Sequence, residues 1–471
     1  LGDIDHHFWE PPLLTALVGA ALSLRKAGER DVVLRGALFG LALLAALFIQ
    51  TTFLFAAGVL AAALLLVSAD EPRTLAAAAV GYGVALLGVT AWRLARPPGI
   101  PDYEWYLGWP QIAALAAAAI ACAAGAALVR GPRTARILVS VAAGTAVALA
   151  VPHAALGLVD GAALFGDPWI RTMVECRSVF ENEAPWRTAL YVFGGGVLLL
   201  PVLLFGAARE KSRGRLLFGL VALVYVAAAV SSLRFSIAAA PLVAISAAAV
   251  VGDTWRAGRR LLAGAAALVA LGPGLVFAAP SIATPSPSVP PEAAPMLRVT
   301  SFLRAHPGGR VLGPLSWGHL FDVAGLHPAV LDNFGSMIGR EPFRARLRVF
   351  LLTDEAAVAR WCRASGVRWV VLEPPFTALP LVVESLGEPL LPYLRPPPCP
   401  GGAFTFTRRT QATFWWRAFY DGGRARPEMG RFGTPFRSFR LAYRDAQPAG
   451  VGPYRGPSAE VWELVEASPS P

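Results

Sequence analysis

The chain has 471 residues, of which 55% are hydrophobic and 15% are charged, and its mean hydropathy is +0.52. Soluble globular proteins carry roughly 25% charged residues, so this composition excludes an ordinary soluble protein and predicts an integral membrane protein. The net charge of +11 comes almost entirely from arginine. We attribute it to basic loops on one face of a membrane rather than to nucleic-acid binding.

The chain begins with a polar segment, Gly2-Asp3-Ile4-Asp5-His6-His7-Phe8-Trp9-Glu10. Because neither an initiator Met nor a signal peptide precedes it, we expect a fragment that lacks its N-terminal part. Asp5 and His7 stand two residues apart, so on an extended loop both can reach one divalent cation. The alternative is a polar cap before a helix, with Pro11 and Pro12 in the first turn.

A membrane-spanning helix needs about 20 apolar residues, with roughly 17 as the lower limit. The hydrophobic pattern predicts ten spans, the first of them short. They cover residues 12–24, 32–49, 51–68, 74–91, 110–129, 135–156, 188–207, 214–231, 234–251 and 260–279.

Basic residues concentrate in alternate loops between these spans. They are Arg25-Lys26-Arg30, Arg73, Arg130-Arg133-Arg136, Arg209-Lys211-Arg213-Arg215 and Arg256-Arg259-Arg260. Cytoplasmic loops are enriched in Lys and Arg, so we place this set in the cytoplasm. With an even number of spans, Asp5, the 157–187 loop, Arg234 and the chain after residue 280 then lie on the extracytoplasmic face.

Two further residues on that face are candidates for a site. Glu175 lies in the long 157–187 loop, and we expect it either to reach the cation of Asp5 and His7 or to be a solvated carboxylate. Arg234 separates two spans that have no real loop between them. An arginine at this depth either marks a functional site, such as one for phosphate, or extends its side chain to the interface.

Residues 280–295 are rich in Pro and Ser and predict a linker. Beyond it, residues 296–471 predict a mixed α/β domain, which gives the chain a polytopic α-helical membrane domain followed by an extracytoplasmic domain. We expect helices at 296–304 and 354–365. We expect strands at 309–315, 367–372, 403–407, 413–419, 436–443 and 460–465.

Several motifs, in this order, resemble the catalytic subunit of oligosaccharyltransferase, a GT-C membrane glycosyltransferase. They are Asp5-His6-His7, Thr172-Met173-Val174-Glu175, Ser232-Leu233-Arg234-Phe235, Ser316-Trp317-Gly318-His319, Val330-Leu331-Asp332-Asn333, Phe439-Arg440-Leu441-Ala442-Tyr443 and Val461-Trp462-Glu463-Leu464-Val465. The resemblance covers essentially the whole chain. Members have thirteen spans, and the motif that resembles Asp5-His6-His7 precedes the fourth, so ten spans should remain here.

The resemblance implies a metal-dependent transfer of a glycan from a polyprenyl-diphosphate donor to asparagine in a polypeptide acceptor. Asp5, His7 and Glu175 would bind Mn²⁺ or Mg²⁺, with Asp5 and Glu175 as the catalytic carboxylates. Arg234 would bind the donor phosphates. The acceptor would contact Ser316, Trp317 and His319.

The chain departs from the family at two places. The family's first Asp-X-Asp motif would lie upstream of Leu1, so we expect this chain alone to be inactive. Pro314-Leu315-Ser316-Trp317-Gly318 stands where the family has Trp-Trp-Asp-Tyr-Gly, and its Asp is replaced by uncharged Ser316. A lipid, glycan or hydroxyl acceptor is therefore an alternative, and a membrane protein without catalytic activity is another.

Overall fold

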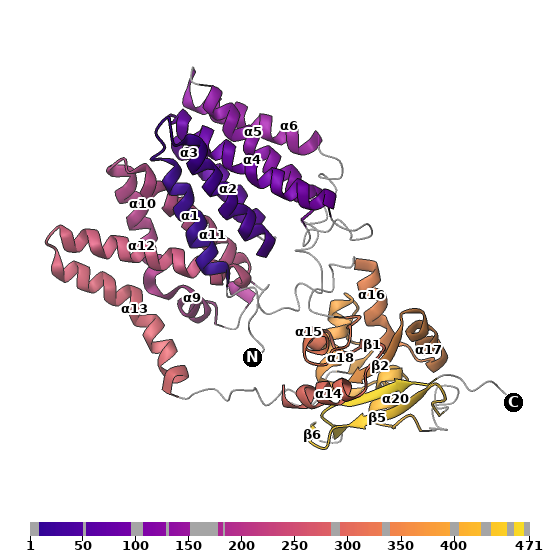
Figure 1. The fold of residues 1–471 in the computed structure, drawn as a ribbon. Coiled ribbons are helices and arrows are strands. Elements are labelled where there is room, and N and C mark those ends of the chain that lie inside the picture. The colour runs from indigo at the N-terminus through magenta and orange to yellow at the C-terminus, as the bar shows by residue number, and fades with distance from the viewer. Residues whose placement is uncertain are drawn as a thin grey trace. The chain divides into compact units, whose positions relative to one another are not determined.

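The computed structural model describes residues 9–49, 53–95, 107–128, 131–150, 178–181, 184–283, 293–331, 340–395, 405–424, 435–449 and 456–465. These residues form two compact units (Figure 1). Unit 1 contains the described residues up to Ala283, and unit 2 contains those from Ala293 onward. Each unit is described by itself.

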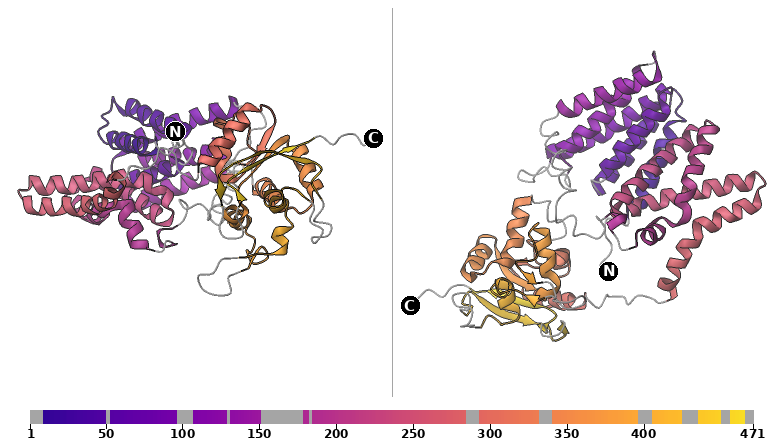
Figure 2. Two further views of the ribbon diagram at one scale, coloured as in Figure 1. Left: turned by 90° about the horizontal axis from the view of Figure 1, so that it is seen from below. Right: turned by 180° about the vertical axis from the view of Figure 1, so that it is seen from behind.

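Unit 1 is built of helices. Its elements are α1 (Glu10–Leu24), α2 (Val32–Ile49), α3 (Phe53–Ser68), α4 (Pro72–Ala95), α5 (Trp109–Ala127), α6 (Arg133–Ala150), η3 (Val179–Glu181), α9 (Pro185–Phe193), η4 (Gly194–Leu199), α10 (Leu200–Arg209), α11 (Arg213–Ser231), η5 (Leu233–Phe235), α12 (Ser236–Arg256) and α13 (Arg260–Ala283). Figure 2 shows α12 and α13 as an antiparallel pair.

Apolar helices lie at the predicted membrane segments. Among the described residues, seven helical segments are long and apolar enough to cross a membrane. Three shorter apolar helices cover Glu10–Leu24, Phe53–Ser68 and Arg260–Pro273. The segment Pro185–Arg209 is not a continuous α-helix, because the 3-10 stretch η4 separates α9 from α10. Gly195 lies in η4, where an added Cβ would come within 1.8 Å of the Val269 carbonyl oxygen on α13. Glycine is therefore required for this close approach.

Helices α2 and α4 also pack through glycines. A Cβ at Gly36 would lie 2.5 Å from the Ala77 carbonyl oxygen, and one at Gly40 would lie 2.3 Å from the Gly81 carbonyl oxygen. The two glycines stand four residues apart on one helix face, so the α2 and α4 backbones can approach closely along it. Such small-residue contacts are a common way for helices to pack in lipid.

Ion pairs join five of the turns between the helices. Arg25 binds Glu71 at 2.8 Å, and Arg73 binds Glu29. Arg136 pairs with Asp70, Arg213 binds both Asp70 and Glu71, and Arg215 reaches Asp253 at 2.6 Å. These are the five loops in which the sequence concentrates its basic residues. The contacts therefore place these loops at one end of unit 1, which we call the ion-pair end.

Unit 2 contains helices and short strands. Its elements are α14 (Ala294–Ala305), β1 (Arg310–Leu312), η6 (Leu315–Trp317), α15 (Gly318–Val323), α16 (Arg340–Arg348), η8 (Val349–Leu351), α17 (Glu355–Ala364), β2 (Val367–Leu372), α18 (Pro375–Ser385), β3 (Leu394–Arg395), β4 (Thr405–Phe406), α19 (Arg408–Gln411), α20 (Phe414–Phe419), β5 (Phe439–Arg444), β6 (Pro448–Ala449), β7 (Gly456–Pro457) and β8 (Glu460–Leu464).

The central sheet of unit 2 has the order β1-β2-β8-β5. Strands β1 and β2 are parallel, and β8 pairs antiparallel with both β2 and β5. One face packs on α14 and α15, where Met296, Val299 and Phe321 join Trp369 and Val461 in a buried cluster. Because side chains alternate along a strand, Val370 and Leu372 belong to the opposite face.

One predicted strand is wrong. Residues 413–419 were expected to form a strand, but Phe414–Phe419 form helix α20. The Thr413 hydroxyl oxygen accepts a hydrogen bond from the Trp416 backbone N–H at 3.2 Å and caps the helix. The cap and burial of every residue of α20 outweigh the β-propensity of Phe and Trp. The helices near 296–304 and 354–365 and the strand 367–372 are confirmed.

Candidate active site

The first residues of α1 lie at the end of unit 1 opposite the ion-pair end. Helix α1 runs from Glu10 towards Arg25, which is held at the ion-pair end by Glu71. Glu10 is buried, whereas Trp9 before it is half exposed. The Glu10 carboxylate lies close enough to Tyr225 of α11 for an electrostatic interaction. A carboxylate in the first turn also interacts favourably with the helix dipole.

Arg234 lies in η5, the short turn between α11 and α12. It is partly exposed. The neighbouring Phe235 ring packs against Phe55 near the start of α3, with ring centroids 5.0 Å apart, and against Tyr225 at 6.5 Å. These ring contacts place η5 at the same end of unit 1 as Glu10.

A third segment reaches this end through Ser178. Its hydroxyl donates a hydrogen bond to the Val230 carbonyl oxygen at 3.0 Å, in the last turn of α11. Val179, the first residue of η3, is buried, and η3 contacts α11. Ser178 lies three residues after Glu175, and Val230 lies four residues before Arg234. The hydrogen bond between Ser178 and Val230 therefore connects the segment after Glu175 to the segment before Arg234. We call the end formed by Glu10, Ser178 and Arg234 the donor end, after the donor phosphates that the family resemblance predicts at Arg234.

The predicted metal ligands Asp5, His7 and Glu175 lie outside the described residues, as do Asp332 and Asn333. Within the described ranges, no group of three or more His, Cys, Asp or Glu side chains could hold a metal ion. Glu10 follows the predicted ligands Asp5 and His7, and Ser178 follows Glu175. The structure places Glu10 and Ser178 at the same end of unit 1 as Arg234.

The predicted acceptor residues lie in unit 2, directly after β1. Ser316 and Trp317 belong to η6, and His319 is in the first turn of α15. The Ser316 side chain is exposed, and Trp317 and His319 are partly exposed. Because β1 and β2 are parallel, their carboxyl ends meet at the same edge of the sheet. In open α/β sheets this edge is the usual place for ligands.

Glu373 follows β2 at the same edge, and the sequence analysis missed it. It follows Val370, Val371 and Leu372, which are fully buried. Burial raises the pKa of Glu373 to about 7, although the neighbouring Trp317 indole acts to lower it. The available signal was an acidic residue immediately after a buried strand, in Val370-Val371-Leu372-Glu373.

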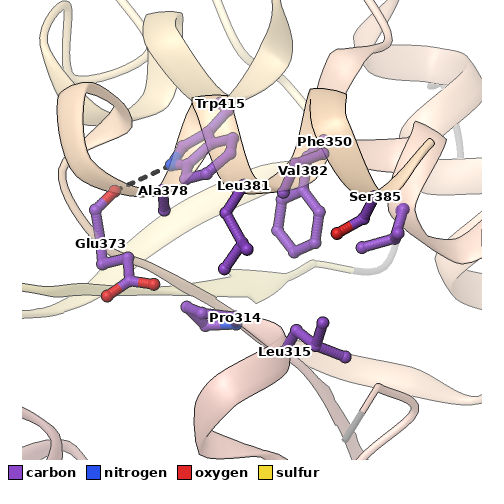
Figure 3. Close-up of a pocket in the computed structure, with 10 residues that line it drawn as sticks. Pro314, Leu315, Phe350, Glu373, Ala378, Leu381, Val382, Ser385 and Trp415 are labelled. Atoms are coloured by element: carbon purple, nitrogen blue, oxygen red, sulfur yellow. Dashed lines mark hydrogen bonds between the residues drawn. The ribbon is translucent and has the colours of Figure 1, made fainter. Parts of the chain in front are cut away.

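A small hollow surrounds the Glu373 side chain (Figure 3). Its walls are mostly apolar and include Pro314, Leu315, Phe350 and Ala378. Trp415 closes one side, and its indole N–H donates to the Glu373 backbone carbonyl oxygen at 2.9 Å. Pro314 and Leu315, which directly precede the predicted acceptor residues, therefore lie with Glu373 around one hollow at the carboxyl edge of β1 and β2.

No protein-family model matches the chain, and no curated protein matches it either. Solved structures do match. Archaeal oligosaccharyltransferase AglB from Archaeoglobus fulgidus, in complex with an inhibitory peptide and a dolichol-phosphate, superposes with a TM-score of 0.72 over 94% of this chain. The chain has the fold of the oligosaccharyltransferase catalytic subunit. Sequence identity to this oligosaccharyltransferase is 14%, and the chain spans 62% of its length.

Two further structures of the Archaeoglobus fulgidus oligosaccharyltransferase show the same fold. The apo form gives a TM-score of 0.68 at 15% identity, covering 95% of this chain and 63% of that one. The form tethered to an acceptor peptide with the NVT sequon gives 0.63 at 14% identity, covering 94% and 62%. A complex with Zn and sulfate is also similar, with a TM-score of 0.63 at 14% identity over 94% of this chain and 61% of that one.

Proposed function

We propose that this chain is part of an oligosaccharyltransferase-like membrane glycosyltransferase. It would transfer a glycan from a polyprenyl-diphosphate donor to asparagine in a polypeptide acceptor. The observation that carries the proposal is the shared fold over 94% of the chain, with Arg234, Glu10 and Ser178 gathered at one end of unit 1. The similar structures contain a dolichol-phosphate in one case and an acceptor peptide in another, which supports both substrate classes.

The topology proposed is that of ten spans, with the ion-pair end in the cytoplasm. Residues 1–279 would form the membrane catalytic domain, residues 280–295 the linker and residues 296–471 an extracytoplasmic domain. The ion pairs that join the five basic loops support placing these loops on one side. The donor end then faces the extracytoplasmic side.

At the donor end, Arg234 would bind the diphosphate. Its planar guanidinium can donate two parallel hydrogen bonds to phosphate oxygens. The partial exposure of Arg234 agrees with this role, and the packing of Phe235 against Phe55 and Tyr225 fixes the backbone that carries it. A fixed guanidinium can stabilise negative charge on the leaving group without reorganising during the reaction.

We propose Asp5, His7 and Glu175 as the ligands of Mn²⁺ or Mg²⁺. Two carboxylates and an imidazole suit these ions, and the imidazole favours Mn²⁺. Only two residues separate His7 from Glu10 and two separate Glu175 from Ser178, and three peptide units span at most about 11 Å. When bound, the cation would offset the negative charge that develops on the diphosphate. A similar structure contains Zn and sulfate, which supports a metal-dependent enzyme.

Acceptor binding would use Ser316, Trp317 and His319. A second acceptor class, a lipid or glycan hydroxyl, is favoured by Ser316, because the family's carboxylate is missing from that position. Glu373 follows β2 at this edge of the sheet, however, so the edge retains an acidic group. This favours the peptide acceptor.

The test is glycan transfer in membranes that contain the protein at its natural full length. A lipid-linked oligosaccharide donor and Mn²⁺ are supplied with paired peptides that carry Asn-X-Thr or Gln-X-Thr. We expect transfer to the asparagine peptide alone, and loss of transfer in Asp5→Ala and Glu175→Ala. Glu29→Ala, at the exposed surface of the ion-pair end, is the matched control and should stay active. Donor consumption without transfer to either peptide would establish the second acceptor class instead.

A further inference from the structure

Exposed positive charge gathers on two adjoining turns of unit 1. Residues 209–215, at the turn between α10 and α11, and residues 253–260, at the turn between α12 and α13, contain seven basic and two acidic residues. Arg215 joins the two turns, because its guanidinium binds Glu210 at 3.1 Å and Asp253 at 2.6 Å. The turns therefore form one surface rather than two separate ones.

The two carboxylates of this surface do not neutralise it. Both of them, Glu210 and Asp253, are already bound by arginines. Within the part of the chain that the structure describes, Arg209, Lys211 and Arg259 are exposed and have no carboxylate partner. Positive charge is thus left facing outward, where an anion can bind.

The turn between α12 and α13 has an ordered backbone (Figure 1). Gly258 has a φ of +76°, and the Arg259 backbone N–H donates to the Thr254 carbonyl oxygen at 3.1 Å, which closes the end of α12. The Arg260 guanidinium lies over the Trp255 ring, 5.6 Å from its centroid, where a cation and an aromatic ring attract each other. The turn therefore presents its arginines from a defined position.

The apolar side chains beside these cations indicate the class of partner. Phe205 is exposed on α10 four residues before Arg209, so the two lie on the same helix face. Leu261 is exposed directly after Arg260, and Trp255 is half exposed. Tryptophan is enriched at the edge of a membrane, where its ring meets lipid and its N–H meets water. The surface thus offers positive charge next to hydrocarbon contacts, which a phospholipid matches with its phosphate and its acyl chains.

We propose that Arg209, Lys211, Arg256, Arg259 and Arg260 form a basic surface that binds the headgroup of an anionic phospholipid in the surrounding membrane. A guanidinium can donate paired hydrogen bonds to phosphate oxygens, and each basic side chain near an anionic lipid surface strengthens binding about fivefold. A soluble acidic protein or a nucleic acid would match the charge but not the apolar side chains beside it. The inference requires a membrane protein and does not depend on glycan transfer.

The first measurement compares two lipids that differ only in their headgroup. The protein at its natural full length, in a non-ionic detergent, is titrated with dioleoylphosphatidylglycerol or dioleoylphosphatidylcholine, and bound lipid is measured by native mass spectrometry. We expect Arg259→Gln with Arg260→Gln to weaken phosphatidylglycerol binding about 20- to 30-fold and to leave phosphatidylcholine binding unchanged.

Lys26→Gln with Arg30→Gln is the matched control. It removes two exposed positive charges from the turn between α1 and α2, where residues 26–31 carry equal numbers of acidic and basic side chains. This pair should change phosphatidylglycerol binding less than about twofold. An equal loss in the two double variants, or no loss in Arg259→Gln with Arg260→Gln, would overturn the proposal.

The second measurement locates the bound lipid. The protein is placed in nanodiscs of phosphatidylcholine alone or mixed with phosphatidylglycerol, and hydrogen exchange is followed by mass spectrometry. We expect phosphatidylglycerol to slow exchange at residues 253–262, whereas inorganic phosphate added to phosphatidylcholine nanodiscs should not. Equal protection by phosphate would overturn the assignment to a lipid, and no protection by either would overturn the site.

A second pair of substitutions keeps the test valid if Arg259→Gln with Arg260→Gln does not fold. Because the two turns form one surface, Arg209→Gln with Lys211→Gln should also reduce the protection that phosphatidylglycerol gives at residues 253–262. Unchanged protection in this variant would show that the α10–α11 turn does not belong to the site and would overturn the proposal as stated.

Discussion

Units 1 and 2 treat polar and apolar groups in opposite ways. In unit 1 large apolar side chains are exposed along the helices, as Leu261, Leu271 and Val276 are on α13, and ion pairs join the turns at one end. In unit 2 the apolar side chains are buried around a sheet, and carboxylates such as Glu460 are buried with them. Exposed apolar side chains suit the hydrocarbon interior of a membrane, whereas buried ones suit water. The chain therefore combines one unit adapted to lipid with one adapted to water.

The largest expected effect is at the close contact between α2 and α4. Gly40→Leu would place a side chain against the Gly81 carbonyl oxygen, so the two backbones must separate. We expect a loss of about 3 kcal/mol in the free energy of unfolding, with little folded protein recovered. Gly83→Leu on α4, where an added Cβ meets nothing within 4 Å, is the control. Thermal unfolding in detergent measures both, and equal melting temperatures would contradict the packing described.

The next effect concerns Glu71 at the ion-pair end. Burial acts to raise its pKa, but hydrogen bonds from Arg25 and Arg213 outweigh burial and lower the pKa to about 2. The unfolded chain therefore takes up a proton first as pH falls, so the stability that Glu71 provides is present above about pH 4.5 and is lost towards pH 2.

Glu71→Gln should lower the free energy of unfolding at pH 7 by about 2 kcal/mol and remove this acid dependence. Glu29→Gln removes a carboxylate that is 78% exposed and should cost less than about 0.5 kcal/mol. The measurement is the melting temperature between pH 3 and pH 7. A similar effect from both variants would show that the network at Glu71 is no stronger than a surface pair.

Glu460 in unit 2 should respond to pH in the opposite direction. Burial raises its pKa to about 7, although hydrogen bonds from Trp462 and Arg444 act to lower it. The folded protein therefore keeps its proton to a higher pH than the unfolded chain. Stability is complete below about pH 4.5 and decreases as pH rises through 7.

We expect protection of β8 from hydrogen exchange to fall by about 1 kcal/mol between pH 5 and pH 8, after correction for the intrinsic rates. Glu460→Gln should make the corrected protection independent of pH. The peptides of α1 and α4 in the same sample are the internal reference. A rise in β8 protection with pH would contradict the raised pKa.

The smallest effect is expected at the apolar surface of unit 1. Leu261 is 92% exposed, so Leu261→Ala should change the free energy of unfolding in detergent by less than about 0.5 kcal/mol. Leu303→Ala in unit 2 removes a fully buried side chain and should cost about 2–3 kcal/mol. Equal costs at the two positions would remove the distinction between the two units.

The sequence predicted some elements closely because local signals agreed with the final packing. The strand 367–372 was found from its β-branched residues and matches β2. Residues 413–419 were wrongly expected to be a strand, because the Thr413 cap competes with an aromatic run and only tertiary burial decides between them. The break of Pro185–Arg209 at η4 depends on how close α13 comes to Gly195, which no local pattern encodes.

The candidate site was predictable to a different extent in the two units. Arg234 was singled out because an arginine between two apolar spans is unusual, and the structure places it with Glu10 and Ser178. Glu373 was missed because its position depends on the parallel pairing of β1 with β2. This pairing brings it to the same edge of the sheet as Trp317, which lies 56 positions earlier in the sequence. Asp5, His7 and Glu175 remain predictions.

The network at Glu71 also has a consequence for the order of assembly during synthesis. Arg25 is made before Glu71, but Arg213 follows Glu71 by 142 residues. At roughly 5–20 residues per second, the ribosome adds Arg213 about 7–30 s after Glu71. Arg25 can therefore bind both carboxylate oxygens of Glu71 early, and Oε1 later accepts a further hydrogen bond from Arg213. The network at Glu71 can therefore be complete only after α11, in the late half of unit 1, has been made.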